Sequence, residues 1–251
     1  MSQPLSGGNM SGALRVGDTV RRDAGPWTPT VHRLLEHLRA HGVPGVPKPH
    51  GLDQHGREVL EFLPGEVPSY PMPAWVWNDD LLVSAARWLR RFHDATTDLS
   101  RGGERWQLPD HPPVEVICHN DFAPYNMVFD AEHRLVGVID FDTCSPGSRV
   151  WDLAYLAYRI VPFHTPGTLQ TPTTAAAQRV DRLKLLCDSY GRPSPATSSP
   201  YSLSASETST TSPRFGPPRP APPRSSTATS PRTRWTLPTW ASSPPTSNAP
   251  V

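Results

Sequence analysis

The stretch that decides the interpretation of this sequence is CHNDFAPYN, residues 118–126, followed one predicted hairpin later by VIDFD, residues 138–142. Asp121 and Asn126 lie on an irregular, proline-containing loop between strands, where side chains can converge on a cleft. Asp140 ends an apolar strand, where a buried carboxylate without a partner is costly. A divalent cation removes that cost, and Mg²⁺ prefers a few oxygen ligands together with substrate phosphates. The spacing therefore predicts a metal site at Asn126 and Asp140, with Asp121 free to orient a hydroxyl group and accept its proton.

The hydrophobic pattern around this stretch predicts an α+β fold. Strands are predicted over residues 13–16, 19–22, 45–52, 57–63, 114–118, 127–129 and 135–139. Apolar residues recur at helical spacing over residues 28–42, 78–97, 149–160 and about 173–190. The order of these elements predicts a small sheet with one helix at the start of the chain and a larger, mainly helical part after it.

Composition excludes several classes of protein. The formal net charge of +1 removes the electrostatic argument for a nucleic-acid binder. The sequence has no run of 18 apolar residues and no apolar segment in its first ten residues, which argues against a spanning helix and a secretory signal. Three widely spaced cysteines fit reduced thiols better than a disulfide framework or a zinc site. We therefore expect a cytoplasmic protein that binds neither nucleic acid nor membranes.

The motif at residues 119–121, with Asn126 five residues after Asp121 and with Asp140 and Asp142 on a later strand, resembles the catalytic and metal-binding loops of protein-kinase-like enzymes. It is most similar to the aminoglycoside phosphotransferase and choline kinase group. The metal motif of that group is followed by Gly and then Asp-Leu-Ala, and this chain continues in the same way with GSRVWDLA, residues 147–154.

The resemblance covers about residues 5 to 190 and implies a two-lobed, protein-kinase-like fold. Its lobes are expected at residues 1–66, for nucleotide binding, and 67–191, for catalysis. The implied activity is the Mg²⁺-dependent transfer of the γ-phosphoryl group of ATP, or of GTP, to a hydroxyl of a small molecule such as an aminoglycoside, choline or a related amino-alcohol or sugar. By the same resemblance, Asp121 is the catalytic base, Asn126 and Asp140 bind the metal, and structural support comes from His119, Asp142 and Asp152, the last by hydrogen bonds to the catalytic loop from below.

The resemblance also places the nucleotide. It implies cofactor contacts from Gly7, Gly8, Arg21, Glu61 and Leu63. The first two belong to a glycine-containing loop in the place of the phosphate-covering hairpin, and the last two belong to the segment that meets the adenine.

The strand cation of the family falls at Arg21 or Arg22, either of which can clamp a phosphate. Arg21 is favoured because it directly follows Thr19-Val20. The carboxylate that usually pairs with this cation from the next helix is not evident, because Glu36 lies about 140° from the apolar face of that helix at ~100° per residue.

The last part of the chain has a different composition. From Pro193 to Val251 the chain has 14 Pro, 14 Ser, 10 Thr, one acid and no Lys, which predicts disorder over residues 192–251. Serines at near-helical spacing in this tail become apolar residues if the same message is read one base earlier. We therefore expect a frameshift, in the genome or in the sequencing, after about Gly191; the alternative is a genuine disordered linker.

Two functions remain open at this point. The retained Asp121, Asn126 and Asp140 favour an active phosphotransferase. The interrupted helical pattern after about Gly191 and the missing helix carboxylate favour a catalytically inactive remnant that binds nucleotide or a partner without turnover.

Overall fold

An antiparallel sheet with one helix forms the first part of the computed structural model, which describes residues 2–5, 12–99, 103–162 and 176–191. The strands are β1 (Ser2–Pro4), β2 (Leu14–Val16), β3 (Thr19–Arg22), β4 (Pro49–Leu52) and β5 (Glu58–Glu61). They lie in the order β1-β2-β3-β5-β4. The helix α1 spans Thr28–Ala40 and buries its apolar stripe, which includes Val31, Leu34, Leu35 and Leu38.

The register of this sheet decides which side chains of β3 share a face. Arg21 is paired with Val59 and Arg22 with Glu58. Because successive side chains of a strand point to opposite faces, the two arginines point in opposite directions. Only one of them can therefore face the segment that carries Asp140 and Asp142.

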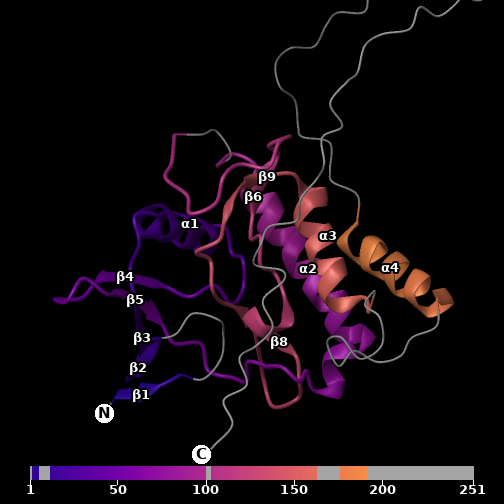
Figure 1. Cartoon of the computed structure of the whole chain (residues 1–251), viewed down its shortest axis with the longest axis horizontal. Helices are drawn as coiled ribbons and strands as arrows, with labels where there is room; N and C mark the ends of the chain where they lie inside the picture. The colour runs from indigo at the N-terminus through magenta and orange to yellow at the C-terminus, as the bar shows by residue number, and fades with distance from the viewer. Residues whose placement is uncertain (1, 6–11, 100–102, 163–175, 192–251) are drawn as a thin grey trace, which may run out of the picture. The chain divides into compact units, whose positions relative to one another are not determined.

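The second part of the chain is mainly helical. Its helices are α2 (Asp79–Ala95), α3 (Arg149–Ile160) and α4 (Ala176–Tyr190), with short 3₁₀ turns η1 (Ala74–Trp77) and η2 (Pro124–Asn126). Its strands are β6 (Val116–Cys118), β7 (Met127–Phe129), β8 (Leu135–Val138) and β9 (Ser145–Gly147), paired as β6 with β9 and β7 with β8. Figure 1 shows α2, α3 and α4 packed beside one another, away from the five-stranded sheet.

Aromatic rings from several segments form the centre of the core. Trp88 of α2 stacks on Phe92 and on Phe122, and its indole N–H donates to the carbonyl of Pro44 at 2.7 Å. The core therefore holds α2 against the loop that follows β6 and against the segment that precedes β4.

The segment after β5 is fixed closely to β7. Glu66 and Phe129 exchange two backbone hydrogen bonds of 2.8 Å. A Cβ at Gly65, whose φ is +150°, would lie 2.5 Å from the carbonyl oxygen of Phe129, so this approach requires glycine. The contact joins the sheet to the hairpin of β7 and β8, whose open end carries Asn126 and Asp140 of the predicted metal site.

The predicted α+β architecture is confirmed, and several boundaries are corrected. Two short strands, β1 and β9, were not predicted; β9 is Ser-Pro-Gly, which lacks the β-branched and aromatic residues of typical strands. The strands predicted over 45–52 and 57–63 are shorter, at Pro49–Leu52 and Glu58–Glu61. The predictions for residues 192–251, including disorder and a frameshift, lie outside the described residues.

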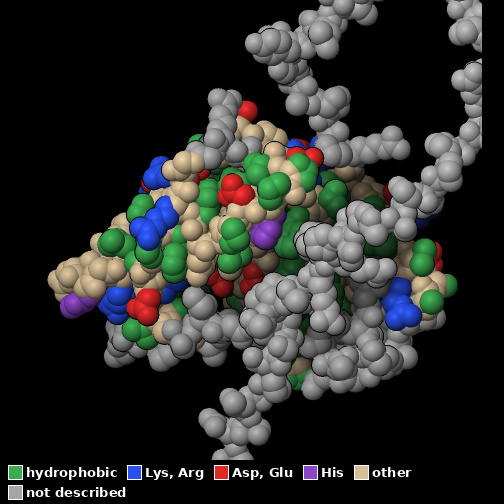
Figure 2. Space-filling model, turned by 45° about the horizontal axis from the view of Figure 1, so that its top comes forward, with side chains coloured by type: hydrophobic (Ala, Val, Ile, Leu, Met, Phe, Trp, Pro, Cys, Tyr) green, Lys and Arg blue, Asp and Glu red, His purple; other side chains and the backbone are tan. Residues whose placement is uncertain are grey.

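Charged groups of both signs lie over the part of the surface that carries β4 and β5, as Figure 2 shows at the left of its view. In the described ranges, each helix is too short or too polar to cross a membrane.

Candidate functional site

The loop after β6 is held from below by one buried carboxylate. Asp152 of α3 accepts hydrogen bonds from the backbone N–H of His119, at 2.7 Å, and of Asn120, at 3.0 Å. Asn120 has a φ of +65°, an uncommon conformation for a residue other than glycine. Because these bonds fix the turn immediately before Asp121, they set the direction in which the Asp121 side chain leaves the loop.

Asp152 is itself part of a buried polar chain. His93 of α2 contacts Asp152 through Nε2, at 3.1 Å, and Tyr190 of α4 through Nδ1, at 2.7 Å. Burial lowers the pKa of His93 even though Asp152 opposes this effect. A neutral imidazole therefore donates its Nε2 proton to Asp152 and accepts from the Tyr190 hydroxyl. The pKa of Asp152 is lowered because hydrogen bonds from His93 and His119 outweigh its burial.

Asp121 is surrounded by hydrogen-bond donors. The Asn126 amide donates to the backbone carbonyl and to Oδ2 of Asp121, both at 2.9 Å. On the other carboxylate oxygen, Oδ1 accepts from the hydroxyl of Tyr125, at 2.5 Å, and from that of Tyr155. These contacts fix the rotamer of Asp121 from two sides.

Both tyrosines remain protonated at neutral pH. Burial and the negative charge of Asp121 raise the pKa of Tyr155 to about 12 and that of Tyr125 further. Arg159, one turn of α3 after Tyr155, donates to the Tyr155 hydroxyl from Nε at 3.1 Å and from Nη2 at 2.8 Å. Its guanidinium also lies over the rings of Tyr125, Tyr155 and Tyr158, between 5.1 and 5.4 Å from their centroids.

The second cluster of the site lies at the end of β8. The backbone N–H of Ile139 donates to the backbone carbonyl of Asn126 at 2.9 Å, which brings the end of β8 to η2. Asp140 then adopts a φ of +64°. Left-handed backbone at a residue other than glycine is typical of functional sites, where the surrounding structure maintains the strain.

Arg22 of β3 connects this cluster to the sheet. It donates from Nη1 to Asp140 at 3.1 Å, from Nη2 to Asp142 at 2.6 Å and from Nε to the fully buried Glu58. His32 of α1 contacts the other oxygen of Glu58 at 2.9 Å. Arg22 is thus the cation shared by three carboxylates.

Burial and neighbouring charges shift the pKa values of Arg22, Asp142 and Glu58. Burial alone would lower the pKa of Arg22, but Asp142, Glu58 and Asp140 together raise it. Burial raises the pKa of Asp142 to about 6 despite the guanidinium beside it. The pKa of Glu58 is lowered, because His32 and Arg22 outweigh its burial.

A divalent cation fits the donors that the structure brings together. Asn126 uses its amide nitrogen for Asp121, and its amide oxygen accepts no hydrogen bond from the described residues. Asp140 has one oxygen on Arg22, and its side chain is 24% exposed. An amide oxygen and a partly solvated carboxylate are hard oxygen donors of the kind that Mg²⁺ prefers.

The structure places the other predicted residues as follows. Arg21 donates to the Thr19 hydroxyl at 2.5 Å and lies 3.8 Å from Asp53, so Arg22 is the arginine that meets Asp140. Glu61 pairs through its backbone with Lys48 of the segment before β4, and its carboxylate accepts from Arg39 at 3.0 Å. Leu63 packs against the Gly137 backbone. Gly7 and Gly8 lie outside the described residues.

His119 is fully buried beside Phe92, Phe122 and Phe141. Neither of its ring nitrogens has a hydrogen-bond partner among the described residues. Its ring thus packs beneath the loop, while its backbone N–H is held by Asp152.

No role was predicted from the sequence for Glu58 or for three residues around Asp121, namely Tyr125, Tyr155 and Arg159. Glu58 takes the place of the expected helix carboxylate, since Glu36 is exposed. The only signal in the sequence is an acid beside the apolar pair Val59-Leu60 on a predicted strand, and this pattern does not specify that the acid is buried. Tyr155 and Arg159 lie one helical turn apart on α3, but this spacing alone does not show that they reach Asp121.

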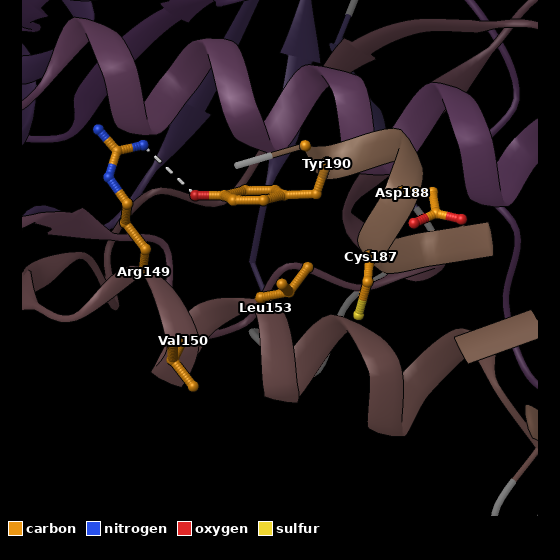
Figure 3. Close-up of a pocket in the computed structure, with 7 residues that line it drawn as sticks. Arg149, Val150, Leu153, Cys187, Asp188 and Tyr190 are labelled. Carbon is orange, nitrogen blue, oxygen red and sulfur yellow. Dashed lines mark hydrogen bonds between the residues drawn. The ribbon is translucent and has the colours of Figure 1, made fainter. Parts of the chain in front are cut away.

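A surface hollow of about 520 Å³ lies elsewhere, between α3 and α4. Figure 3 shows Leu153 and Cys187 facing one another across it and Arg149 donating to the Tyr190 hydroxyl. Its lining includes none of the residues of the two clusters described above.

The profile of the phosphotransferase enzyme family matches residues 104–186, which include Asp121, Asn126, Asp140 and Asp152. The chain is 31% identical over 196 residues to the trifolitoxin immunity protein of Rhizobium leguminosarum bv. trifolii, covering 74% of this chain and 73% of that protein.

Solved structures show the same fold. An aminoglycoside phosphotransferase from Streptomyces rimosus, in complex with ADP and streptomycin, superposes with a TM-score of 0.51 at 13% identity, over 77% of this chain and 87% of that one. An ethanolamine kinase from Plasmodium vivax also gives a TM-score of 0.51 at 13% identity, over 76% and 72% of the two chains. The predicted kinase-like fold is thereby confirmed.

Proposed function

Since this chain belongs to the phosphotransferase enzyme family, we propose that it transfers the γ-phosphoryl group of ATP, or of GTP, to a hydroxyl group of a small molecule. The observation that carries the proposal is the convergence of Asp121 and Asn126, at 2.9 Å, beside the end of β8 that bears Asp140. A carboxylate and a buried amide from one loop thus lie beside the partly exposed Asp140 at the end of β8.

The proposed roles follow from the geometry of each group. Asp121, held by Asn126 and by two tyrosine hydroxyls, orients the acceptor hydroxyl and takes its proton as the oxygen attacks phosphorus. Asn126 and Asp140 are the proposed ligands of Mg²⁺, which when bound neutralises charge on the transferring phosphoryl group. Asp152 positions the loop through its backbone, and Asp142 holds Arg22.

Arg22, rather than Arg21, is the proposed contact for the nucleotide phosphates. It extends from β3 toward Asp140. Its Nε donates to Glu58, and Glu58 is held in turn by His32 of α1. Three of the five N–H groups of Arg22 are used by Glu58, Asp140 and Asp142, which leaves one N–H on each Nη for phosphate oxygens. The segment from Glu61 to Gly65 remains the proposed contact for the base, and the first part of the chain, residues 1–66, remains the proposed nucleotide lobe.

The test measures acceptor-dependent formation of ADP by the full chain with Mg²⁺ and ATP. The acceptors are a panel of aminoglycosides, choline, amino-alcohols, sugars and hydroxy acids. We expect Asp121→Asn to lower kcat by roughly 100- to 10,000-fold, the usual worth of general base catalysis. The matched control is Asp130→Asn, an acid in the exposed turn between β7 and β8 that pairs with Arg134. Equal rates for Asp121→Asn and the parent chain would falsify the assignment of the base.

A protective role is the second candidate, and the relative named as a trifolitoxin immunity protein supports it. Such a role is compatible with the same chemistry, because phosphorylation of a hydroxyl can inactivate a toxic compound. The inactive alternative is tested by the same assay: nucleotide binding without acceptor-dependent ADP across the panel would indicate a binding protein.

A further inference from the structure

We propose that Arg159, with Tyr125 and Tyr155, forms an acceptor subsite that selects hydroxyl compounds carrying a carboxylate group over cationic ones. The inference rests on the proposed function in one respect: Asp121, as the base, marks the side of the site where the acceptor binds. It goes further by assigning the charge of the acceptor from residues that the family resemblance does not include.

The tyrosine hydroxyls lie where an acceptor hydroxyl would bind. The Tyr155 hydroxyl donates to Oδ1 of Asp121, which is the hydrogen bond that an acceptor hydroxyl must make to its base. Arg159 donates to the same Tyr155 oxygen from two of its nitrogens, at 2.8 and 3.1 Å. A cation therefore stands one hydrogen bond from Asp121, within reach of the substituents of a bound acceptor.

Arg159 differs from Arg22 in the charge of the groups that it contacts. Among the described residues, Arg159 contacts tyrosine rings and one hydroxyl but forms no ion pair. Arg22 contacts three carboxylates. An arginine in direct contact with neutral groups alone has N–H groups left for an anion, and its planar fork matches the geometry of a carboxylate. The same charge repels an ammonium group at this distance.

Tyrosine rings line the space beside Arg159. The ring of Tyr70 lies 6.1 Å from that of Tyr125, and the Tyr70 side chain is exposed. The rings of Tyr70 and Tyr125, with those of Tyr155 and Tyr158 around Arg159, give the subsite flat, apolar walls. Such walls favour an acceptor with a planar or aromatic framework. A hydroxyl compound with an aromatic ring and a carboxylate satisfies the base, the rings and the guanidinium together.

The experiment compares two probes that share a phenol and differ in charge, 4-hydroxyphenylacetate and tyramine. Binding of each to the full chain is measured by titration calorimetry, in the presence of Mg²⁺ and ADP. We expect the carboxylate probe to bind more tightly than the amine. Arg159→Gln should weaken its binding by roughly 10- to 100-fold, the usual effect of losing hydrogen bonds to a charged group, and Arg159→Glu should reverse the preference.

The control variant is Arg134→Gln, an exposed arginine paired with Asp130 and Glu132, which should bind both probes as the parent does. Arg159→Lys, which keeps the charge, guards against a folding defect in Arg159→Gln and should retain the preference for the carboxylate probe. Tighter binding of tyramine, binding of neither probe, or equal affinities in parent and Arg159→Gln would overturn the proposal.

The two proposals fail separately in this design. Turnover of a cationic acceptor with no preference for the carboxylate probe removes the subsite and keeps the phosphotransferase. Binding of the carboxylate probe through Arg159, without ADP formation on any acceptor, keeps the subsite and removes the phosphotransferase.

Discussion

The two clusters of the site differ in how their charges are matched. Around Arg22, one guanidinium meets the three carboxylates of Glu58, Asp140 and Asp142, and two of these acids are almost fully buried. Around Asp121, one carboxylate accepts from two neutral hydroxyls, and the nearby Arg159 has no described acid as a partner. The first cluster carries excess negative charge, whereas in the second the charges of Asp121 and Arg159 balance but are separated by the Tyr155 hydroxyl.

This difference indicates what each cluster lacks. Excess carboxylates at low solvent exposure favour the arrival of cations, which fits the proposed metal at Asp140. An arginine supported only by tyrosines favours the arrival of an anion. The charge of the ligand on each side can thus be inferred from the charged groups that lack a direct counterion in the described residues.

The largest expected effect on stability comes from Arg22→Met. It leaves Glu58 and Asp142 buried without their cation, so we expect the free energy of unfolding to fall by roughly 3 to 5 kcal/mol. The matched variant Arg159→Met removes no ion pair and loses only its hydrogen bonds to the Tyr155 hydroxyl, so it should cost about 1 to 2 kcal/mol. Urea denaturation at pH 7, followed by circular dichroism, measures both. Equal losses would mean that the two clusters are not different in the way we describe.

Asp140→Asn separates the chemistry of the first cluster from its stability. The Asp140 side chain is partly solvated, so unfolding should change by no more than about 1 kcal/mol. If Asp140 is a metal ligand, kcat should fall by at least ~100-fold, and raising the Mg²⁺ concentration should recover part of it. The acceptor-dependent ADP assay measures this. A variant with parental activity and parental Mg²⁺ dependence would exclude Asp140 as a ligand.

The buried pair of His93 and Asp152 beneath the Asp121 loop gives a pH dependence of its own. Burial lowers the pKa of His93, so below the ordinary histidine pKa the unfolded chain binds a proton that the folded chain does not. The contribution of His93 should therefore fall as the pH drops below about 6.5, with a slope of at most about 1.4 kcal/mol per pH unit, whereas Asp142, whose pKa is raised to about 6, contributes in the opposite direction as it takes up a proton.

His93→Gln should be less stable at pH 7.5 and should lack this slope. The contribution of Asp152, whose pKa is lowered, is present above its unfolded value and disappears only as the pH falls below about 4. Urea midpoints between pH 5 and 7.5 separate the two. A slope that persists in His93→Gln would assign the effect to another group.

The smallest effect is expected from the tyrosine hydroxyls. Tyr155→Phe removes the donor to Asp121 and also the oxygen that accepts from Arg159, whereas Tyr125→Phe removes a donor to Asp121 and a contact with the Tyr155 hydroxyl. We expect losses of about 1 kcal/mol for each in unfolding free energy, with the larger loss for Tyr155→Phe. A double-mutant cycle of Tyr155→Phe with Arg159→Met should show coupling, and strict additivity would contradict the contact.

The neighbourhood of Asp121 could be predicted in part because its residues are close in sequence. Asp121 and Asn126 are separated by one proline-containing turn, so their contact depends mainly on local geometry. Tyr155 and Glu58 were missed for the opposite reason. Each reaches the site from an element far along the chain, and nothing in the local pattern of α3 or β5 specifies that approach.

The sequence by itself determined the α+β architecture, the positions of α2 and α3, and the proline-containing loop that carries Asp121, because hydrophobic periodicity and short loops act over neighbouring residues. Only the tertiary structure decided that Arg22 meets Asp140 while Arg21 turns toward Asp53. The physical reason is that adjacent residues of a strand face opposite sides of the sheet. Which side meets the helical part depends on the pairing of β3 with β5 and on packing between distant segments.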